Sequence, residues 1–423
     1  MTSAERHEAR YQRRRVRRTQ KLIERQKSFE EVFSFGHLVR SGRKCCNGVR
    51  WKTSTILFET FLLQEAWRTL KEFRTGRRSF RGFHSFKLTE HGKTRAIDAL
   101  PIRYRAAQKC FCKYFLYDVY SPSFVYDNGA SLPQKGMDFS LKRMRKHLRE
   151  HSKRHGLEGG IYQYDFKSYF SSIPHSEIKE SARKRIFDRR LLLIFFQWID
   201  DFQLLQTARA GEHRGVGLGS EISQLIALDY AGRLDHYFKD ACGIRGYGRY
   251  MDDGYVISDS VDRLKHLMAD AYKISGALGL RMSDKKNTIK KFQHHGFSFL
   301  KMRTRLHGEN VTMKISRNGI RSVRRKLSIF RRWVTEGRMG AEDVFASYQS
   351  WRAHARRAQS YDTLQAIDER FADMFKKELG ARRLRFPCTM IAVKGSDGWE
   401  YHRRNMGRKG IRWNILHITR TAG

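Results

Sequence analysis

Two adjacent carboxylates, with strand-forming residues on both sides, constrain this chain more than any other feature of its sequence. They are Asp252 and Asp253, in the run Tyr250-Met251-Asp252-Asp253-Gly254. Tyr, Val and Ile favour strands, and Asp-Asp-Gly favours a tight turn. The sequence therefore predicts a β-hairpin over residues 245–258 with both carboxylates at its turn. Because such turns also occur in ordinary hairpins, the pair by itself does not identify a function.

A third carboxylate and a glycine-rich segment precede this hairpin. Asp165 ends a predicted strand over residues 161–166, and glycines at 215, 217 and 219 precede a predicted long helix over residues 223–238. Carboxylate oxygens are the ligands that Mg²⁺ prefers. Two such ions, about 4 Å apart, promote attack of a hydroxyl on a phosphate, because one activates the hydroxyl and the other neutralises the leaving group. The ordered set predicts a two-Mg²⁺ site at Asp165, Asp252 and Asp253.

The charge of the chain predicts a polyanionic partner. Lys and Arg number 85 against 43 Asp and Glu, which gives a formal net charge of +42. Phosphates neutralise such an excess and release counterions. A ribosome-binding or membrane-surface protein can be equally basic, so charge alone indicates a polyanion and nothing finer. Residues 1–30 are rich in Arg, and we interpret them as an arm that orders on RNA or DNA, with a solvated helix as the alternative.

Apolar periodicity predicts an α+β fold in which a mixed region is followed by helices. Residues 83–100 are typical of a hairpin, with Lys93 and Arg95 on one face. Strands and helices mix over residues 160–310, whereas residues 314–380 lack strand patterns. The predicted helices are residues 103–117, 138–155, 174–186, 261–278, 319–336, 341–358 and 361–379, and residues 297–300 form a predicted strand. No apolar run approaches the roughly 20 residues of a membrane span, so we expect a cytoplasmic protein without a membrane partner.

Several segments, taken in order, resemble the sequence boxes of reverse transcriptases of the prokaryotic retroelement type. The similarity covers about residues 80–310. Tyr250-Met251-Asp252-Asp253 resembles the Tyr-x-Asp-Asp box, and Asp165 with Tyr169-Phe170 resembles the box with the first catalytic aspartate. The other similar segments are Lys93-Thr94-Arg95 and residues 101–108 (fingers), Leu218 to Gln224 (middle box), Leu280 to Thr288 (a lysine-bearing segment) and Phe297 to Leu300 (primer grip).

The resemblance implies a right-hand polymerase fold with fingers, palm and an α-helical thumb. The predicted domains are a basic helical extension (1–50), fingers (51–160), palm with interleaved fingers elements (161–310), helical thumb (311–385) and a basic aromatic extension (386–423).

The resemblance also implies roles for individual residues. Phe170 would contact the sugar and leave no room for a 2′-hydroxyl, and Lys93 with Arg95 suits triphosphate oxygens. Gly219 permits close approach of a nucleotide or template, and Gln224 can bond a base or sugar. Lys285 or Lys286 can protonate the leaving pyrophosphate. The remaining implied contacts are Phe166 at the metal ions, Lys285 among the nucleotide-binding residues, and Tyr250, Met251, Phe299 and Leu300 with primer and template.

Departures from the family pattern narrow the subtype. The middle box has Leu-Gly and Ser-Gln, where intron-encoded relatives have Gln-Gly and Ser-Pro. Tyr104 stands where relatives often carry Asp, which puts a fingers contact in doubt. We find no Cys/His-rich endonuclease segment, no Val-Thr-Gly signature of retron enzymes and no carboxylate cluster of an RNase H domain. These features favour the diversity-generating group or a defence-associated or unclassified group.

The leading hypothesis is an RNA-directed DNA polymerase that uses dNTPs to make cDNA on a noncoding RNA, which serves as scaffold and template. Antiphage defence is favoured over mutagenic diversity generation, by analogy alone. An RNA-copying RNA polymerase usually has Gly-Asp-Asp instead. An inactive nucleic-acid-binding protein with the same fold is the third hypothesis, and the three carboxylates argue against it. The sequence leaves open the primer, and whether the chain forms a homo-oligomer or binds an accessory protein.

Overall fold

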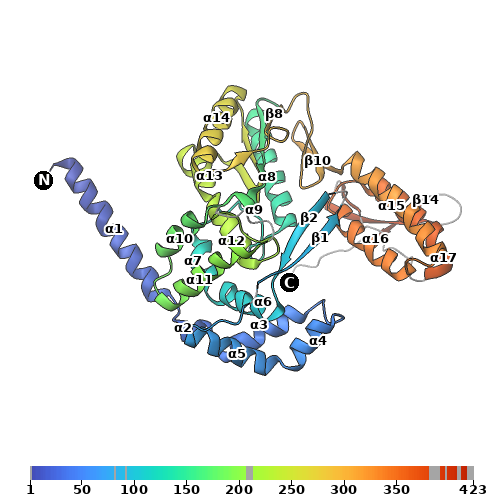
Figure 1. Ribbon diagram of the computed structural model, residues 1–423. Coiled ribbons are helices and arrows are strands. Elements are labelled where there is room, and N and C mark those ends of the chain that lie inside the picture. The colour runs from blue at the N-terminus through green and yellow to red at the C-terminus, as the bar shows by residue number, and fades with distance from the viewer. Residues whose placement is uncertain are drawn as a thin grey trace, which may run out of the picture. The chain divides into compact units, whose positions relative to one another are not determined.

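The computed structural model describes residues 2–80, 82–90, 93–205 and 213–380, and the backbone of three further strands, residues 391–395, 398–406 and 411–416. The chain divides into two compact units, Met1–His294 and His295–Gly423, and each is described by itself. Figure 1 labels the elements where there is room. The boundaries predicted for fingers, palm and thumb stay a prediction.

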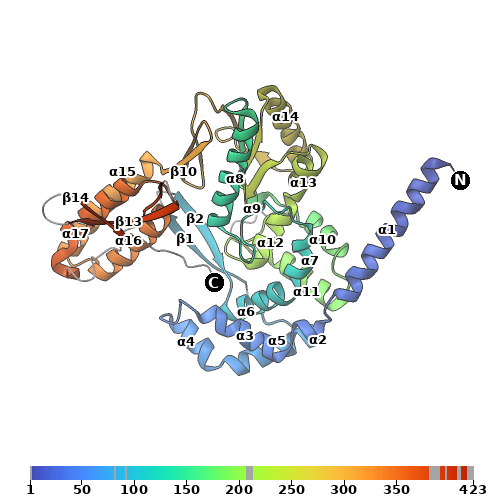
Figure 2. The ribbon, with the colours of Figure 1, turned by 180° about the vertical axis from the view of Figure 1, so that it is seen from behind.

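A four-stranded antiparallel sheet with strand order β5-β6-β3-β8 organises the first unit. The strands are β3 (Gly160–Tyr164), β5 (Gly246–Tyr250), β6 (Asp253–Ser258) and β8 (Thr288–Lys291). Successive side chains of a strand point to opposite faces. Tyr255 on β6 faces α8 (Met137–His155), where its hydroxyl bonds the His147 ring. Val256 enters the main core with residues of α14 (Val261–Ala277). The two helices therefore cover opposite faces of the sheet, as both views show (Figures 1 and 2).

The rest of the first unit is largely helical. A small sheet pairs β4 (Phe166–Lys167) with β7 (Arg281–Met282), and a separate hairpin pairs β1 (His84–Glu90) with β2 (Lys93–Ala99). The helices are α1 (Ser3–Arg25), α2 (Phe29–Val32), α3 (Phe35–Cys46), α4 (Thr53–Thr60), α5 (Leu62–Thr75), α6 (Ile102–Phe111), α7 (Tyr117–Tyr120), α9 (Tyr169–Ser172), α10 (His175–Arg183), α11 (Arg189–Asp201), α12 (Glu221–Tyr230) and α13 (Gly232–His236), with short 3₁₀ or π turns at Cys112–Leu116, Ser121–Ser123, Phe202–Leu204 and Tyr237–Ala241.

The second unit contains an antiparallel sheet and three helices. The sheet has the order β11-β10-β9, with β9 (Phe297–Phe299), β10 (Met302–His307) and β11 (Asn310–Ile315). The helices α15 (Arg317–Thr335), α16 (Ala341–Ala355) and α17 (Tyr361–Leu379) share one apolar core. Within it, the buried Arg352 pairs with Asp368 at 2.8 Å. A separate sheet joins β12 (Ile391–Gly395), β13 (Gly398–Met406) and β14 (Ile411–Leu416).

Most predicted elements are confirmed, with three differences. The single long helix expected over residues 223–238 is wrong, because the chain breaks it at Ala231 into α12, α13 and a π turn. The helix expected over residues 103–117 likewise contains a π turn at Cys112–Leu116. The β10–β11 hairpin was not predicted. The mixed α+β class is confirmed, and in the described part of the chain no helix combines the length and apolar character that a membrane crossing needs.

Candidate active site

The tip of the β5–β6 hairpin is a strained two-residue turn. Tyr250 pairs with Asp253, so Met251 and Asp252 make the turn. Met251 has φ of +60°, in the region that glycine normally occupies, which is the pattern of a type II′ turn. A non-glycine residue there costs about 1–3 kcal/mol. The predicted Asp-Asp-Gly turn is therefore wrong by one residue, because Gly254 lies inside β6.

A buried ion pair fixes this turn from inside the protein. The guanidinium of Arg249 pairs with Asp235 at 2.6 Å, and both side chains are almost fully buried. Arg249 also donates to the carbonyl of Met251 at 2.8 Å and to that of Leu228 at 2.8 Å. Tyr247 donates its hydroxyl to Asp235 at 2.5 Å. The strained residue is thus tied through Arg249 to two helices of the core.

Gly254 is required by its neighbour on β3. Tyr164 pairs with Gly254, and a Cβ atom at Gly254 would lie 2.1 Å from the Tyr164 ring. The Tyr164 hydroxyl in turn bonds that of Tyr247 at 2.8 Å. No other residue type fits at position 254 unless this ring moves, so the glycine lets β3 and β6 approach beside the turn.

The register of β3 and β6 brings the three predicted carboxylates together. Tyr164 lies opposite Gly254, so the next residues along the two strands are Asp165 and Asp253. Residues directly opposite in such a pair have Cβ atoms about 5 Å apart. The side chains of Asp165 and Asp253 share a hydrogen bond, and Asp165 acts electrostatically on Asp252. Asp165 is buried, whereas Asp252 and Asp253 are partly exposed.

Crowding changes the acidity of this cluster. Burial, the hydrogen bond with Asp165 and the neighbouring negative charges raise the pKa of Asp253 to about 7, although Lys286 opposes the shift. Burial and the charge of Asp165 also raise the pKa of Asp252. Carboxylates that raise one another's pKa gain from a nearby cation. The cluster therefore favours the binding of positive charge.

Lys286 supplies one such charge. Its ammonium pairs with a carboxylate oxygen of Asp165 and lies 3.7 Å from an oxygen of Asp253. Although burial opposes the shift, these partners raise the pKa of Lys286. The lysine is held by backbone contacts, because the amide of Ser283 donates to the Asp165 carbonyl at 2.8 Å and a turn from Ser283 leads to Lys286.

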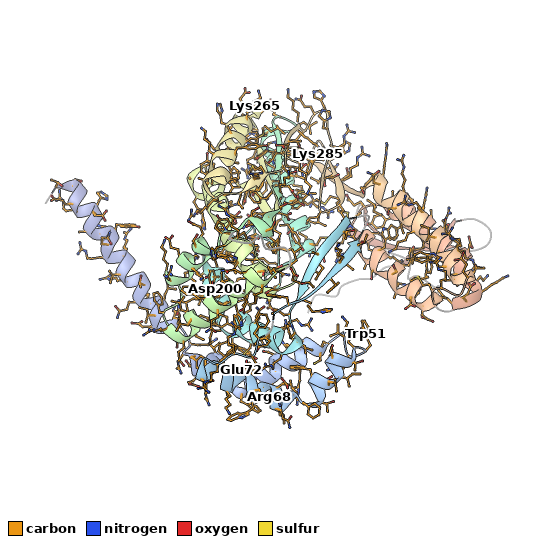
Figure 3. The ribbon with its side chains drawn as sticks, in the orientation of Figure 1. Trp51, Arg68, Glu72, Asp200, Lys265 and Lys285 are labelled. Carbon is orange, nitrogen blue, oxygen red and sulfur yellow. The ribbon has the colours of Figure 1, made fainter. Side chains whose placement is uncertain are left out.

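Lys285, the residue that the sequence favoured, is exposed at the surface (Figure 3). Two adjacent lysines in a basic chain carry no signal that tells them apart. Tertiary structure determines which lysine meets the carboxylates. The β4–β7 pairing places Phe166 opposite Met282, and the turn that follows β7 then brings Lys286 to them. The role predicted for Phe166 at a metal ion stays a prediction.

The donor set suits a hard divalent cation. Within the described residues, no three His, Cys, Asp or Glu side chains are arranged as a complete metal site. The ammonium of Lys286 nevertheless lies between Asp165 and Asp253, where it balances their charge. Three carboxylates with oxygen donors only are the ligand type that Mg²⁺ prefers. Side-chain rotation, with Lys286 displaced, would allow them to bind such an ion.

The glycine-rich segment lies beside Phe170. The amide of Val216 donates to the Phe170 carbonyl at 2.8 Å, and that of Gly215 donates to the Ile173 carbonyl at 2.8 Å. Gly215 has φ of +93°, and a Cβ there would approach the backbone of Ser171 to 3.3 Å. Phe170 is partly buried against the core. The glycine-rich segment and the segment after Asp165, about 45 residues apart in sequence, are therefore neighbours.

A cavity of about 630 Å³ lies at the middle box, and we call it the Gly219 cavity. Gly219 and Gln224 line it together with the cations Lys44, Arg105 and Lys109. Of these, Lys109 pairs with Glu221 at 3.1 Å.

The Gly219 cavity adjoins the hairpin tip. Leu132 and Tyr117 line the cavity and also belong to the apolar cluster that contains Tyr250 and Met251. It is thus a basic cavity next to the carboxylates, formed by elements from four parts of the sequence, which sequence reasoning did not predict.

The remaining predicted site residues are not brought to the carboxylates by described contacts. Lys93 and Arg95 lie on β2, but their side chains fall outside the described residues. Phe299 on β9 and the adjacent Leu300, which has φ of +48°, belong to the second unit. Their predicted contacts with substrate, primer and template stay predictions.

Comparisons with known proteins give a family match and distant structural likenesses. The sequence pattern of the family "Reverse transcriptase (RNA-dependent DNA polymerase)" matches residues 85–303. No curated protein matches. A structure of apo telomerase from Candida tropicalis, truncated from the C-terminal domain, has 14% sequence identity and a TM-score of 0.39, with 56% of this chain and 55% of that chain covered. Telomerase from Candida albicans in complex with a TWJ fragment of telomeric RNA has 10% identity and a TM-score of 0.41, with 77% and 60% covered. The chain thus spans 55–60% of the chains in these two structures.

Proposed function

The chain belongs to the reverse transcriptase family, and we propose that it is an RNA-directed DNA polymerase in which Asp165, Asp252 and Asp253 carry nucleotidyl transfer. One observation supports this above all others. The end of β3 and the tip of the β5–β6 hairpin bring three carboxylates together, at the expense of raised pKa values for Asp252 and Asp253. An ordinary hairpin gains nothing from this repulsion, whereas a cation-binding centre depends on it.

We propose Mg²⁺ as the ion and two ions as the number. Asp165, Asp252 and Asp253 would hold these ions, which would supply activation of a 3′-hydroxyl and neutralisation of the triphosphate. Asp165 lies at the end of a strand and Asp252 lies in the strained turn, so the fold fixes the backbone positions from which these side chains reach the ions. Phe166, which can offer only its backbone carbonyl oxygen, is the further ligand we propose. The ammonium of Lys286 pairs with Asp165 at this centre, and of the two lysines predicted as proton donors, Lys285 and Lys286, we assign the role to Lys286.

Deoxynucleotide selection is proposed for Phe170, with Gly219 and Gln224 contacting nucleotide or template. The support is the backbone pairing of Phe170 with the glycine-rich segment and the basic Gly219 cavity at the same place. Lys93 and Arg95 remain the proposed ligands of the triphosphate. For primer and template we retain four proposed contacts: Tyr250, Met251, Phe299 and Leu300.

We further propose that a noncoding RNA is both template and scaffold, in the cytoplasm. The net charge of +42 and the exposed, arginine-rich helix α1 support a polyanion of this kind. Antiphage defence is the proposed role, and mutagenic diversification is the alternative; the middle box with Leu-Gly and Ser-Gln fits both. Sequencing the cDNA made in cells separates them. Adenine-directed errors in copies of a repeat would indicate diversification, and repetitive product that rises on phage infection would indicate defence.

The catalytic proposal is tested by primer extension with the full chain. Purified protein is incubated with an RNA template, a primer, Mg²⁺ and either dNTPs or rNTPs. We expect DNA synthesis with dNTPs, and none from the variant Asp252→Ala/Asp253→Ala, which should still bind RNA in a filter or polarisation assay. Synthesis by that variant would remove the two aspartates from the mechanism. Products only with rNTPs would instead assign an RNA polymerase activity, and RNA binding without any product would assign a binding role.

A further inference from the structure

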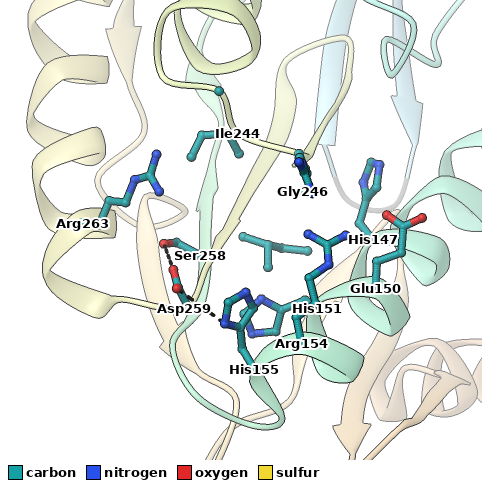
Figure 4. A pocket seen from close by; sticks show the side chains of 13 residues that line it. His147, Glu150, His151, Arg154, His155, Ile244, Gly246, Ser258, Asp259 and Arg263 are labelled. Carbon is teal, nitrogen blue, oxygen red and sulfur yellow. Dashed lines mark hydrogen bonds and ion pairs between the residues drawn. The ribbon is translucent and has the colours of Figure 1, made fainter.

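A second polar pocket lies at the far end of the hairpin that carries the carboxylates. It has a volume of about 180 Å³ and is lined by Gly246 at the start of β5, Ser258 at the end of β6, the last turns of α8 and the start of α14. We call it the Arg154 pocket (Figure 4). The Gly246–Ile257 pair lies four positions along each strand from the Tyr250–Asp253 pair at the turn. At about 3.3 Å per residue, the pocket is about 13 Å from the catalytic tip along the strands.

Three guanidinium groups from three elements surround this pocket. They belong to Arg154 on α8, Arg245 before β5 and Arg263 on α14. Figure 4 shows Arg154 and Arg263 on opposite sides of the hollow. Arg263 is oriented by a bond to the Cys242 carbonyl at 2.8 Å. Among the described residues, neither Arg154 nor Arg245 has a hydrogen-bonding or ion-pair partner for its side chain, so both are available to a ligand.

The acidic side chains of the pocket are already engaged. Glu150 lies 3.5 Å from the ammonium of Lys146. Asp259 accepts a bond from the Ser258 hydroxyl at 3.1 Å and lies 3.6 Å from the ring of His155 (Figure 4). Among the described contacts neither carboxylate forms an ion pair with an arginine of the pocket, so three guanidinium groups stand against two carboxylates.

Two of the histidines that line the pocket, His147 and His151, do not add charge. His151 shares a hydrogen bond with the Glu158 carbonyl at 2.8 Å, and burial lowers its pKa. Burial likewise lowers the pKa of His147 to about 4, so this ring is neutral near pH 7. The positive charge comes from the arginines, which keep it at all physiological pH values.

We propose that the Arg154 pocket binds a backbone phosphate of RNA, as a second nucleic-acid contact away from the polymerase centre. Guanidinium groups form paired hydrogen bonds with phosphate oxygens. Apart from histidines, no aromatic residue lines the pocket, so it offers no ring for stacking a base, and a contact of this kind is independent of sequence. The inference rests on the proposed RNA partner but not on the proposed catalytic roles.

The test compares two arginines on the same helix. Arg154→Gln removes a pocket cation, and Arg149→Gln removes an exposed arginine of α8 that does not line the pocket. The two lie five residues apart, about 140° around the helix, and each variant loses one charge. RNA affinity of the full chain is measured by fluorescence polarisation over a series of KCl concentrations, with thermal unfolding as the check on folding.

We expect Arg154→Gln to weaken RNA binding about tenfold, as the loss of a charged hydrogen bond does. It should also reduce the salt slope by about 0.7, as the loss of one phosphate contact to a single strand does. Arg149→Gln should leave both quantities nearly unchanged, and Arg154→Gln/Arg245→Gln should weaken binding further. Equal behaviour of the two single variants would overturn the proposal.

A second arm separates RNA from a free nucleotide. Saturable binding of dATP or inorganic phosphate that Arg154→Gln abolishes, with RNA affinity intact, would overturn the RNA assignment. The same measurements in the Asp252→Ala/Asp253→Ala background need no activity. Failure of the catalytic proposal and failure of this one are therefore distinguishable, since the first changes synthesis and the second changes only the response to Arg154→Gln.

Discussion

Replacing Arg249 by Met tests whether the buried ion pair positions the catalytic turn. The change leaves Asp235 buried without its cation and removes the donor to the Met251 carbonyl. Breaking a buried pair from one side costs about 3–5 kcal/mol, so we expect a loss of this size in the free energy of unfolding, measured with urea. Arg233→Met is the matched control. Arg233 pairs with Glu177 at 3.0 Å on the surface, and such pairs are worth about 0–1 kcal/mol.

A double variant separates stability from positioning. Asp235→Leu/Arg249→Met removes both charges, so much of the stability should return. The carbonyl of Met251 still lacks its donor, and nothing holds the turn at its strained φ. A misplacement of about 1 Å at a reacting centre can cost about 100-fold in rate. We therefore expect single-turnover primer extension to stay slow by about that factor, with dNTP affinity little changed.

Two results would refute this reasoning. If the double variant regains both stability and full rate, the bond between Arg249 and the turn does not position the aspartates. If Arg249→Met alone loses less than about 1 kcal/mol, as an exposed pair would, the ion pair is not the buried anchor described above.

Four further predictions test other parts of the structure. Phe170→Ala should raise ribonucleotide incorporation in primer extension with mixed substrates, and an unchanged ratio would remove Phe170 as the sugar filter. Gly254→Ala should lower the free energy of unfolding in urea by about 1–3 kcal/mol, because its Cβ would overlap the ring of Tyr164. The control Gly276→Ala, in open space on α14, should raise it by up to about 1 kcal/mol. Equal effects of the two variants would contradict the close packing at Gly254. Burial lowers the pKa of His147 to about 4, whereas His in an unfolded chain titrates near 6.5. The contribution of the neutral ring to the free energy of unfolding should therefore be fully present above about pH 6.5 and fall by about 3 kcal/mol as the pH drops to 4. His147→Gln should flatten this pH dependence, and an identical curve would exclude His147 as its cause. Deleting residues 2–20 should reduce the salt dependence of RNA affinity, and an identical slope would mean that α1 does not contact RNA.

The sequence was sufficient for the parts of the site that depend on local pattern. Alternating strand residues predicted the hairpin at 245–258, and the acidic pair predicted its tip. Pattern alone did not locate the turn, because the need for glycine at 254 comes from the ring of Tyr164, 90 residues earlier. The choice between Lys285 and Lys286 likewise depends on how β4 and β7 pair. These are tertiary facts that no window of sequence contains.

The strand β10 was not predicted although the sequence contains a signal for it. Met302, Thr304 and Leu306 are buried and alternate with exposed residues along β10, which is the period of a strand. The π turn at Tyr237–Ala241 and the break at Ala231 had no such signal, since the apolar spacing continues through both. The partnership of Arg249 with Asp235 was also hidden, because a single arginine in so basic a chain predicts a surface charge.

The anchoring of the hairpin tip by interior side chains has a consequence for which substitutions would inactivate the protein. Tyr164, Asp235, Tyr247 and Arg249 are buried, and their hydrogen bonds support the hairpin tip that carries two of the three acids. A random mutagenesis screen for variants without polymerase activity should therefore find substitutions at these buried residues as well as at the three aspartates. Exposed positions away from the hairpin tip should be recovered less often.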